Sequence, residues 1–206
     1  MDSSKDKMIN GQPYFENDGV LFKERQFVRS QLFQLNQIDP KRVKARNQIF
    51  KNIFGKINGK FFIEPPFFCD YGYNIEIGVN FYANFNLTIL DSAKVIIGDN
   101  AMIGPNVGIF SSTHPIDPEL RIAGVKFARE IIIGDNVWIG GNSVINPGVK
   151  IGNNVIIGSG TVVTKDIPSN MIAAGNPNRI IREIQESDKK IYFKNLQYPA
   201  DINKNT

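Results

Sequence analysis

Residues 133–168 decide the fold, and in groups of six they read IGDNVW IGGNSV INPGVK IGNNVI IGSGTV VTKDIP. Every group begins with Ile or Val, four of the six have Gly in second place, and the fifth place holds Val, Ser, Val, Val, Thr and Ile. The same frame runs through residues 97–114 as IGDNAM IGPNVG IFSSTH, and more loosely from Ile77. A repeat this regular predicts a stack of similar small units.

A period of six with an aliphatic first place predicts short strands joined by tight corners. The first residue of each group fills the interior of a narrow prism, and the smaller or β-branched fifth residue lies where there is less room. Gly and Asn at the corners tolerate backbone conformations that β-branched residues resist. Three groups close one triangular coil, and coils stack by parallel pairing at about 4.8 Å.

We therefore predict a mainly β protein, a parallel β-helix. Two coils are expected in residues 133–168, a third in residues 97–114, and a partial coil before that. Residues 115–132 break the frame, which predicts a loop that leaves the prism between coils. Loops that project from a rigid scaffold commonly carry function.

The segment before the repeats has a helical pattern. Between residues 20 and 35, inward positions recur every three or four residues, at Leu21, Arg25, Val28, Leu32 and Leu35, which predicts an amphipathic helix. A second helix is expected to begin at Asp39 and Pro40, where Asp suits the cap and Pro the first helical position. It carries Val43, Phe50, Ile53 and Phe54 on one side and ends at Gly55.

Three regions follow from these patterns. Residues 1–60 form a helical hairpin that covers an edge of the main domain and caps the acceptor site. Residues 61–184 form the β-helix, with the excursion 115–132, and residues 185–206 form a C-terminal tail. A separate binding function of the hairpin is the alternative, and the two interpretations are compatible if the covered edge is also a site.

The rare residue types exclude several classes of protein. Among 206 residues there is one Cys, Cys69, and one His, so neither an intrachain disulfide nor a tetrahedral Cys/His zinc site is available. The 24 Lys and Arg against 20 Asp and Glu give a net charge of +4 without any run of like charges, which favours a small phosphorylated ligand over nucleic acid. No segment has the length and apolarity of a membrane span or a signal peptide, so we expect a cytoplasmic protein.

The hexapeptides and several further motifs give the chain a specific resemblance. The motifs are FYANFNLTILD (81–91), THPIDPELR (113–121), DNVWIGG (135–141), INPGVKIG (145–152), VVTKDIP (162–168) and AAGNPNRIIREI (173–184). With these the chain resembles the sugar O-acetyltransferases, the maltose and galactoside enzymes above all, from MINGQPYF (8–15) to about residue 193. The resemblance implies a left-handed β-helix, although parallel crossovers are normally right-handed. It also implies a homotrimer that transfers acetyl from acetyl-CoA to a sugar hydroxyl at sites between neighbouring prisms, without a metal.

Such a transfer needs a base for a hydroxyl whose pKa lies far above 7, and donors for the tetrahedral oxyanion. His is the commonest base, and His114 is the only candidate. It occupies the last place of a hexad, where side chains point outward, it directly precedes the frame-breaking loop, and it matches the family's THP motif. A lone His is otherwise more often structural.

Cys69 and Asn84 are two further candidates for a part in the chemistry. Cys69 precedes the repeats and has no basic neighbour in sequence, so we interpret it as a packed thiol rather than an acyl carrier, and we expect direct transfer in a ternary complex. Asn84 is a corner Asn by composition, but the matching family position aids the transition state. Tyr82 beside it is a candidate for the wall of the sugar pocket.

The resemblance also implies the binding residues. Glu16, Asp70 and Ser92 match positions that contact the acceptor sugar, but their identities depart from the galactoside enzyme's pattern, and Asp91 is left as a single acid before Ser92. Thr164, Lys165, Arg179 and Arg182 match positions near the coenzyme phosphates, where charge-assisted bonds are expected. Gly141 and Ser159 match positions whose backbone contacts the pantetheine arm. Trp138 is expected to pack either on the coenzyme or on a neighbouring subunit, and the sequence does not decide between the two.

Three alternatives to sugar acetylation differ in the residues or segments that they need. A γ-class carbonic anhydrase needs more His per site than this chain offers. An antibiotic-modifying (xenobiotic) O-acetyltransferase of the same fold shares a His base but usually lacks the N-terminal helical segment. A catalytically silent trimeric scaffold would need the loss of His114, Asn84 or the basic coenzyme set, and all of these are present.

Overall fold

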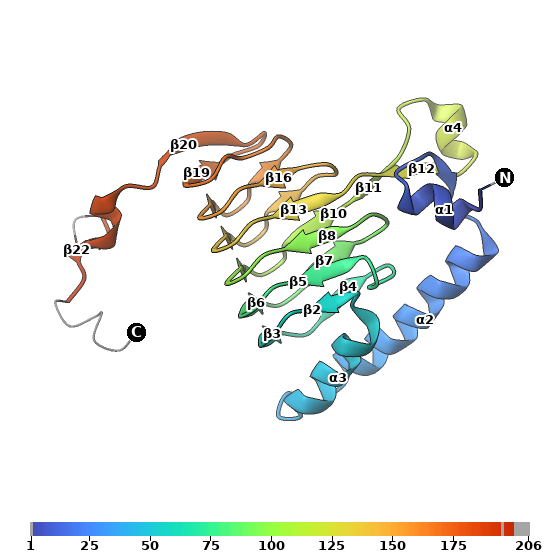
Figure 1. Ribbon diagram of the computed structural model, residues 1–206, viewed down its shortest axis with the longest axis horizontal. Helices are drawn as coiled ribbons and strands as arrows, with labels where there is room; N and C mark the ends of the chain where they lie inside the picture. Colours follow the sequence, from blue (N-terminus) through green and yellow to red (C-terminus); the bar gives the residue numbers. More distant parts are fainter. Residues whose placement is uncertain (1, 195, 200–206) are drawn as a thin grey trace.

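The computed structural model describes residues 2–194 and 196–199 and shows stacked parallel strands with helices beside one end of the stack (Figure 1). The strands form three sheets, here called the first, second and third faces in the order in which the chain visits them. The first face contains β2 (Lys56–Ile57), β5 (Ile75–Ile77), β8 (Val95–Ile97), β13 (Ile131–Ile133) and β16 (Lys150–Ile151). The second contains β3 (Phe61–Ile63), β6 (Phe81–Ala83), β9 (Met102–Ile103), β14 (Trp138–Ile139), β17 (Ile156–Ile157), β19 (Met171–Ala174) and β20 (Arg179–Glu183). The third contains β4 (Phe67–Cys69), β7 (Leu87–Leu90), β10 (Gly108–Phe110), β15 (Val144–Ile145) and β18 (Val162–Val163).

The hexads of residues 133–168 form two coils, as predicted. Strands pair in register between equal hexad places, so that Ile133 lies beside Ile151 and Ile139 beside Ile157. The first-place side chains are at most 2% exposed, namely Ile133, Ile139, Ile145, Ile151, Ile157 and Val163. The fifth-place side chains are equally interior, namely Val137, Ser143, Val149, Val155, Thr161 and Ile167. Burial of one such aliphatic side chain contributes about 1.5–3 kcal/mol, so the repeat itself supplies the core.

The prism is longer at its N-terminal end than the hexads indicate. Two complete coils, β2–β4 and β5–β7, precede the coil at residues 97–114, where only a partial coil was predicted. Ile77 pairs with Ile97, 20 residues on, whereas Ile133 pairs with Ile151, 18 residues on. The early coils thus carry two extra residues each, which fall between the third and first faces and blur the six-residue frame.

Asparagine ladders hold the corners of the prism. Asn80, Asn100, Asn136, Asn154 and Asn170 all have positive φ, which an Asn adopts at lower cost than a bulky residue. Each side-chain amide donates to the amide oxygen of the next along the stack, at 2.8–3.1 Å. The fourth hexad place therefore both permits the turn and ties neighbouring coils together.

The excursion leaves the third face after β10 and returns to the first face at β13. It contains β11 (Ser112–Thr113), α4 (Pro118–Ile122) and β12 (Val125–Ala128), and Asp117 caps α4 by accepting from the Leu120 N–H. The Arg129 N–H donates to the Ser111 carbonyl at 2.8 Å, which closes the neck of the loop. The chain rejoins the prism with the buried Ile131, within the range that the hexad frame leaves to the loop.

The N-terminal helices are α1 (Ser4–Ile9), α2 (Gly19–Asn36) and α3 (Val43–Ile53). The apolar stripe of α2 is buried as predicted, at Leu21, Val28, Leu32 and Leu35. The Asn36 side chain donates to the Phe67 carbonyl and accepts from the Phe67 N–H, so α2 satisfies the open edge of β4. The predicted start of the second helix was wrong: Asp39 accepts from the Lys41 N–H in a turn, and α3 begins at Val43 without a side-chain cap.

The C-terminal part folds back once and then extends away from the prism. β20 pairs antiparallel with β19, and a 3₁₀ helix (Glu186–Lys189) and the pair β21 (Ile191–Phe193) and β22 (Leu196–Gln197) follow. Part of the expected tail, residues 195 and 200–206, lies outside the described residues. Within the described part of the chain, no helix is long and apolar enough to cross a membrane.

Candidate active site

The site lies where the chain passes from the third face to the first, because the hexad frame is interrupted there three times. Residues 70–74, 91–94 and 111–130 make these passages and stand one above another along the stack. The extra residues leave the prism wall and supply side chains that a strict repeat would not offer.

A small antiparallel sheet places His114 at this corner. β12 pairs with β11 on one side and with β1 (Tyr14–Phe15) on the other, and Lys126 lies opposite Tyr14. Thr113 lies opposite Phe127 in the last pair of β11 and β12, and His114 is the residue that directly follows β11. His114 therefore leaves the sheet next to the pair of Tyr14 and Lys126, and its side chain is exposed.

Three of the predicted acceptor residues come together in one cleft of about 240 Å³. Glu16 enters from the residue after β1, Asp70 from the passage after β4, and Ser92 from the passage after β7. The remaining lining comes from Tyr14, Asn17, Phe22, Arg25, Arg29, Tyr71 and Lys126. Elements far apart in sequence thus converge on one polar cleft.

Glu16 is ionised and held in place. Its carboxylate accepts from the Lys126 ammonium at 2.6 Å, and the two side chains are 34% and 20% exposed. This hydrogen bond lowers the pKa of Glu16 below its ordinary value, and the charges of Lys126 and His114 act in the same direction.

The other carboxylates of the cleft are shielded from water. Burial raises the pKa of Asp70, while the charges of Lys126, Arg25 and Arg29 oppose this rise. Asp91 behind it is fully buried, and its Oδ1 accepts from the backbone N–H groups of Asp70 at 3.1 Å and Tyr71 at 2.9 Å. Burial raises the pKa of Asp91 to about 7 in spite of these bonds.

The sequence did not point to Arg25, Lys126, Tyr14 or Tyr71 as cleft residues. Arg25 donates to the Tyr71 hydroxyl at 2.6 Å and to the Glu16 carbonyl at 3.0 Å, so it joins α2 to both walls. The one available indication was its place in the apolar stripe of the helix. Lys126 lies within the frame-breaking loop, where no periodicity assigns a direction to its side chain.

Asn84 and Tyr82 lie on a different corner from His114. Tyr82 projects from β6 on the second face, and Asn84 follows it at the turn into the third face, where its Oδ1 accepts from the Phe85 N–H. Gly141 and Ser159 occupy the same corner in later coils, since they follow β14 and β17. One chain thus brings Asn84 into line with the predicted pantetheine positions but does not bring it to the cleft.

The corner residues have little room for side chains, and Gly140 is buried while Gly141 is partly exposed. A Cβ at Gly140 would lie 2.5 Å from the Ser159 backbone N, and one at Gly141 would lie 3.1 Å from the Pro105 carbonyl O. Ser159 is exposed. The outer edge of this corner, at Gly141 and Ser159, is therefore open to a long, thin ligand, whereas Gly140 is enclosed.

The positions predicted to bind the coenzyme phosphates lie at the C-terminal end of the stack. Thr164 and Lys165 follow β18, and the Asn178 side chain accepts from the Thr164 N–H at 3.0 Å. Arg179 and Arg182 lie on β20 and are exposed. Arg182 differs from the others because its guanidinium already makes a bidentate pair with Asp188, at 2.7 and 2.8 Å.

Trp138 lies on the outer surface of the second face, in register with Met102 of the preceding coil. Both side chains are about half exposed, and Tyr82, which pairs with Met102 in its turn, is 37% exposed. These three side chains continue one apolar row along the face, beside the corner that carries Asn84 and Gly141.

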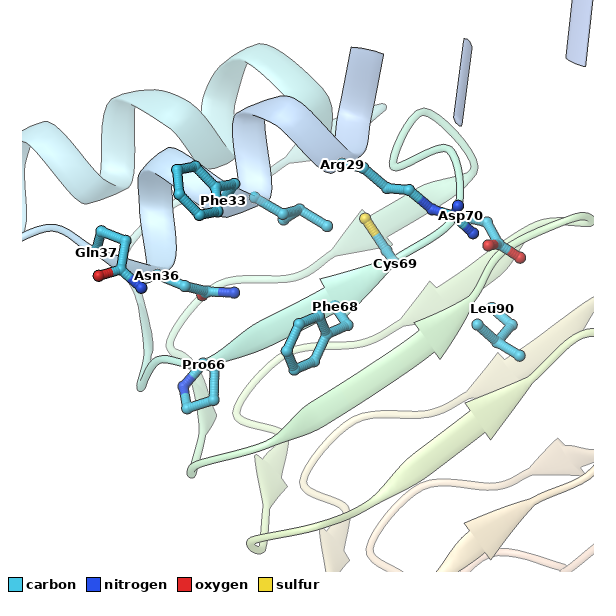
Figure 2. A pocket seen from close by; sticks show the side chains of 10 residues that line it. Arg29, Phe33, Asn36, Gln37, Pro66, Phe68, Cys69, Asp70 and Leu90 are labelled. Atoms are coloured by element: carbon cyan, nitrogen blue, oxygen red, sulfur yellow. The ribbon is translucent and has the colours of Figure 1, made fainter. Parts of the chain in front are cut away.

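A larger groove of about 710 Å³ adjoins the cleft (Figure 2). It runs between α2 and the start of the third face, with Phe33 and Phe68 on opposite walls. Arg29 reaches from α2 toward Asp70, and these two residues line both the groove and the cleft.

Cys69 is buried at the end of β4, and burial raises the pKa of its thiol well above the ordinary value, with Asp91 and Asp70 adding to the effect. It is therefore a packed thiol, not an ionised nucleophile. Within residues 2–194 and 196–199, no group of three or more His, Cys, Asp and Glu side chains is arranged to hold a metal ion.

Comparison with known proteins gives one consistent result. Residues 7–59 match the maltose acetyltransferase hexapeptide capping motif, residues 94–114 the hexapeptide repeat of succinyl-transferase, and residues 130–165 the bacterial transferase hexapeptide of six repeats. The galactoside O-acetyltransferase of Escherichia coli is 48% identical over 171 residues, which cover 83% of this chain and 84% of that protein.

Two solved structures share the whole architecture. A galactoside acetyltransferase in complex with coenzyme A has a TM-score of 0.93 and 42% identity, covering 97% of this chain and 100% of the other. A maltose O-acetyltransferase from Clostridium difficile has a TM-score of 0.88 and 45% identity, covering 90% and 99%. With its capping helices, its hexapeptide prism and its matching relatives, the chain belongs to the hexapeptide-repeat acetyltransferases, alongside the galactoside and maltose O-acetyltransferases.

Proposed function

We propose that the protein transfers the acetyl group of acetyl-CoA to a hydroxyl of a sugar, with His114 as general base. The observation that carries the proposal is the position of His114 directly after β11, next to the pair of Tyr14 and Lys126, which lines the same cleft as Glu16. The printed names of the relatives, galactoside and maltose O-acetyltransferase, support a sugar acceptor, and the coenzyme A complex supports the donor.

The chemistry needs one base that also returns the proton. The imidazole of His114 takes the proton of the acceptor hydroxyl as the oxygen attacks the thioester carbonyl. The tetrahedral intermediate then collapses, the carbon–sulfur bond breaks, and the departing thiolate takes the proton from the imidazolium. Because Cys69 is buried and un-ionised, no covalent acyl-enzyme is required.

The cleft is suited to a sugar because it combines acceptors and donors at short range. Glu16 and Asp70 offer carboxylate oxygens to sugar hydroxyls, and Ser92 offers a hydroxyl. Arg25 adds guanidinium donors held in a fixed direction by Tyr71. In this proposal, α2 and the N-terminal segment before it cover the acceptor site.

The donor fits the corner that carries Gly141 and Ser159. The pantetheine arm follows the accessible backbone there, and the coenzyme phosphates reach Thr164, Lys165 and Arg179 at the end of the stack. Arg182 takes part only if its pair with Asp188 opens, since its guanidinium fork is otherwise filled.

The proposed assembly is a homotrimer whose sites lie between copies. This is supported by the separation of His114 and Asn84 on two corners of one prism. A second copy then brings Asn84 and Tyr82 to the cleft of the first, where the Asn amide donates to the tetrahedral oxyanion.

The test is release of thiol from acetyl-CoA with glucose, maltose, galactosides and chloramphenicol as separate acceptors. We expect release with at least one sugar and not with chloramphenicol. His114→Ala keeps the folded assembly, checked by circular dichroism and size-exclusion chromatography, but loses about 10²–10⁴ in kcat, the usual contribution of a general base. Near wild-type turnover in this variant, or tight coenzyme binding without transfer to any sugar, contradicts the proposal.

A further inference from the structure

The groove between α2 and the start of the third face is continuous with the acceptor cleft. Its volume is about 710 Å³, against about 240 Å³ for the cleft, and Arg29 and Asp70 line both. The cleft lies against the first half of α2, at Phe22 and Arg25, and the groove lies against the second half, from Arg29 to Gln37. A molecule bound in the cleft therefore has a path past Asp70 into the groove.

Two exposed aromatic side chains form the walls of the groove. Phe33 projects from α2 and Phe68 from β4, and they face the groove from opposite sides (Figure 2). Phe33 is 71% exposed and Phe68 is 47% exposed, so most of one ring and about half of the other meet solvent. A flat apolar group between the two rings removes this surface from water, which is favourable.

The lining between these rings offers few hydrogen bonds. The Asn36 amide lines the groove, but its N–H donates to the Phe67 carbonyl and its oxygen accepts from the Phe67 N–H. The charged side chains, Arg29 and Asp70, stand at the end next to the cleft, and Gln37 stands at the far end (Figure 2). The rest of the lining is apolar and comes from Leu32, Pro66, Cys69 and Leu90.

This polarity distinguishes between the groups that a sugar can carry on its glycosidic bond. The hydroxyls of a second sugar ring give up hydrogen bonds to water in the groove and find few replacements, which costs free energy for each group left unpaired. An aromatic or branched alkyl group has no such hydroxyls and gains from contact with the two rings. The groove therefore favours a sugar linked to an apolar group over a sugar linked to another sugar.

We propose that the groove is a subsite for an apolar aglycone, so that the acceptor is a glycoside with its sugar ring in the cleft and its aglycone between Phe33 and Phe68. The inference rests on the proposed function and narrows its class of acceptor. The cleft and the groove join at Arg29 and Asp70, which places the glycosidic bond beside these two residues. The excursion, which contributes Lys126 to the cleft, then lies on the other side of the sugar ring.

The test compares acceptors that differ only in the aglycone. Methyl and phenyl glycosides of glucose and galactose, each as both anomers, and maltose are assayed by thiol release from acetyl-CoA. We expect kcat/KM for the phenyl glycoside of the preferred sugar to exceed that for the methyl glycoside by about tenfold or more, because the added ring is bound in an apolar site. Maltose, whose second group is a sugar, should exceed methyl α-glucoside by less than about threefold. A phenyl-to-methyl ratio within about twofold, or a larger gain with maltose than with phenyl α-glucoside, overturns the inference.

Variants of the two walls test whether the preference arises in the groove. Phe33→Ala and Phe68→Ala should each lower the phenyl-to-methyl ratio about fivefold or more and leave kcat/KM for the methyl glycoside within about twofold. Phe27→Ala is the matched control, since Phe27 is also an exposed phenylalanine of α2, at 61%, but lines a separate pocket with Lys23 and Glu24. An unchanged ratio in both groove variants, or an equal loss in Phe27→Ala, contradicts the assignment.

A second copy of the chain is the competing occupant of the groove. In that case Phe33→Ala lowers kcat/KM with methyl and phenyl glycosides alike and moves the protein to a smaller species in size-exclusion chromatography. This result overturns the inference. If a variant does not fold, the acceptor series on the unmodified protein decides the question.

Binding without turnover separates this inference from the proposed function. In saturation-transfer difference NMR, the aromatic protons of a phenyl glycoside should receive more saturation from the unmodified protein than from Phe33→Ala. This difference, together with no thiol release from acetyl-CoA with any glycoside, rejects acetyl transfer and leaves the groove as an aglycone site. Thiol release with methyl glycosides and no preference for phenyl glycosides rejects the aglycone site and leaves the proposed function.

Discussion

Asp91 is the residue on which the shape of the cleft depends. It is fully buried, and its carboxylate accepts from the N–H groups of Asp70, Tyr71 and, at 3.4 Å, Asn74. The Asn74 side chain in turn donates to the Asp91 carbonyl at 2.7 Å. In the sequence Asp91 stands out only as a single acid before Ser92. Its role could not be read there, because the backbone groups that it binds lie a whole coil earlier.

The raised pKa of Asp91 predicts a pH dependence of stability. The folded-state pKa, about 7, lies above the ordinary value of 3.8 for an Asp, so the fold favours the protonated acid. The resulting contribution to stability is fully present below about pH 4 and is lost as the pH rises through 7. In Asp91→Asn the melting temperature should therefore fall less between pH 5 and pH 8 than in the unmodified protein. Equal falls in the two proteins, measured by calorimetry, contradict the assignment.

Cys69 gives a second prediction at this scale. Because its thiol is buried and its pKa is raised, it does not act as an acyl carrier. Cys69→Ser should retain kcat within about threefold, with any loss appearing in stability instead, since a hydroxyl replaces a thiol in an apolar interior. Loss of turnover in a variant that is still folded at the assay temperature, or a covalent acetyl group on Cys69 in mass spectrometry, speaks against direct transfer.

At the scale of elements, the hexad explains both what was predictable and what was not. Ile133, Ile139 and Ile145 recur at equal spacing because each fills the same interior place, so the strands and their register follow from the sequence. Only a partial early coil was predicted because two extra residues per coil shift the frame, and because Phe67 and Phe81 stand where most later coils have the smaller Ala, Val, Ser or Thr. Helix α3 begins later than predicted because Asp39 caps a turn rather than a helix.

The asparagine ladder predicts a test of corner geometry. Asn136 has φ 57°, and its side-chain amide donates a hydrogen bond to Asn154 and accepts one from Asn100. Asn136→Ala loses both hydrogen bonds, at about 0.5–1.5 kcal/mol each, and replaces an Asn that tolerates left-handed backbone by an Ala, for which this conformation costs about 1–2 kcal/mol. Asn136→Gly loses the bonds but not the backbone freedom.

Chemical denaturation of both variants separates the loss of the hydrogen bonds from the cost of the left-handed backbone. We expect Asn136→Ala to be less stable than Asn136→Gly by about 1 kcal/mol, and both to be less stable than the unmodified protein. If the glycine variant is as unstable as the alanine variant, the hydrogen-bonded ladder accounts for the whole effect and the positive φ for none of it.

At the scale of the whole molecule, the two candidate halves of the site point away from each other. His114 and the cleft lie between the third and first faces, while Asn84, Gly141 and Ser159 lie between the second and third. The sequence supplied these residue types through the family motifs, but hexad spacing does not say which corners meet. That information belongs to the packing of one prism against another.

Complementation between two inactive variants tests the shared site. His114→Ala and Asn84→Ala each lose activity alone, but in randomly mixed trimers every mixed assembly contains one site with both residues intact. About a quarter of the unmodified activity should return, because about three quarters of the trimers are mixed and each has one good site in three. No recovery after co-expression, with mixed trimers verified by mass spectrometry, places both residues in one copy.

The neck of the excursion has a consequence for how such proteins diversify. The Arg129 N–H and the Ser111 carbonyl close the neck, and β13 pairs directly with β8. The pairing of the prism strands therefore does not depend on the length of the inserted loop. The loop that carries His114 and Lys126 can therefore differ between relatives without displacing the corner proposed for the donor, as long as its pairing with β1 is kept. In the proposed function the loop bears on the choice of acceptor and the other corner on the donor, so grafting of the loop is the route to new acceptors that leaves the donor corner unchanged.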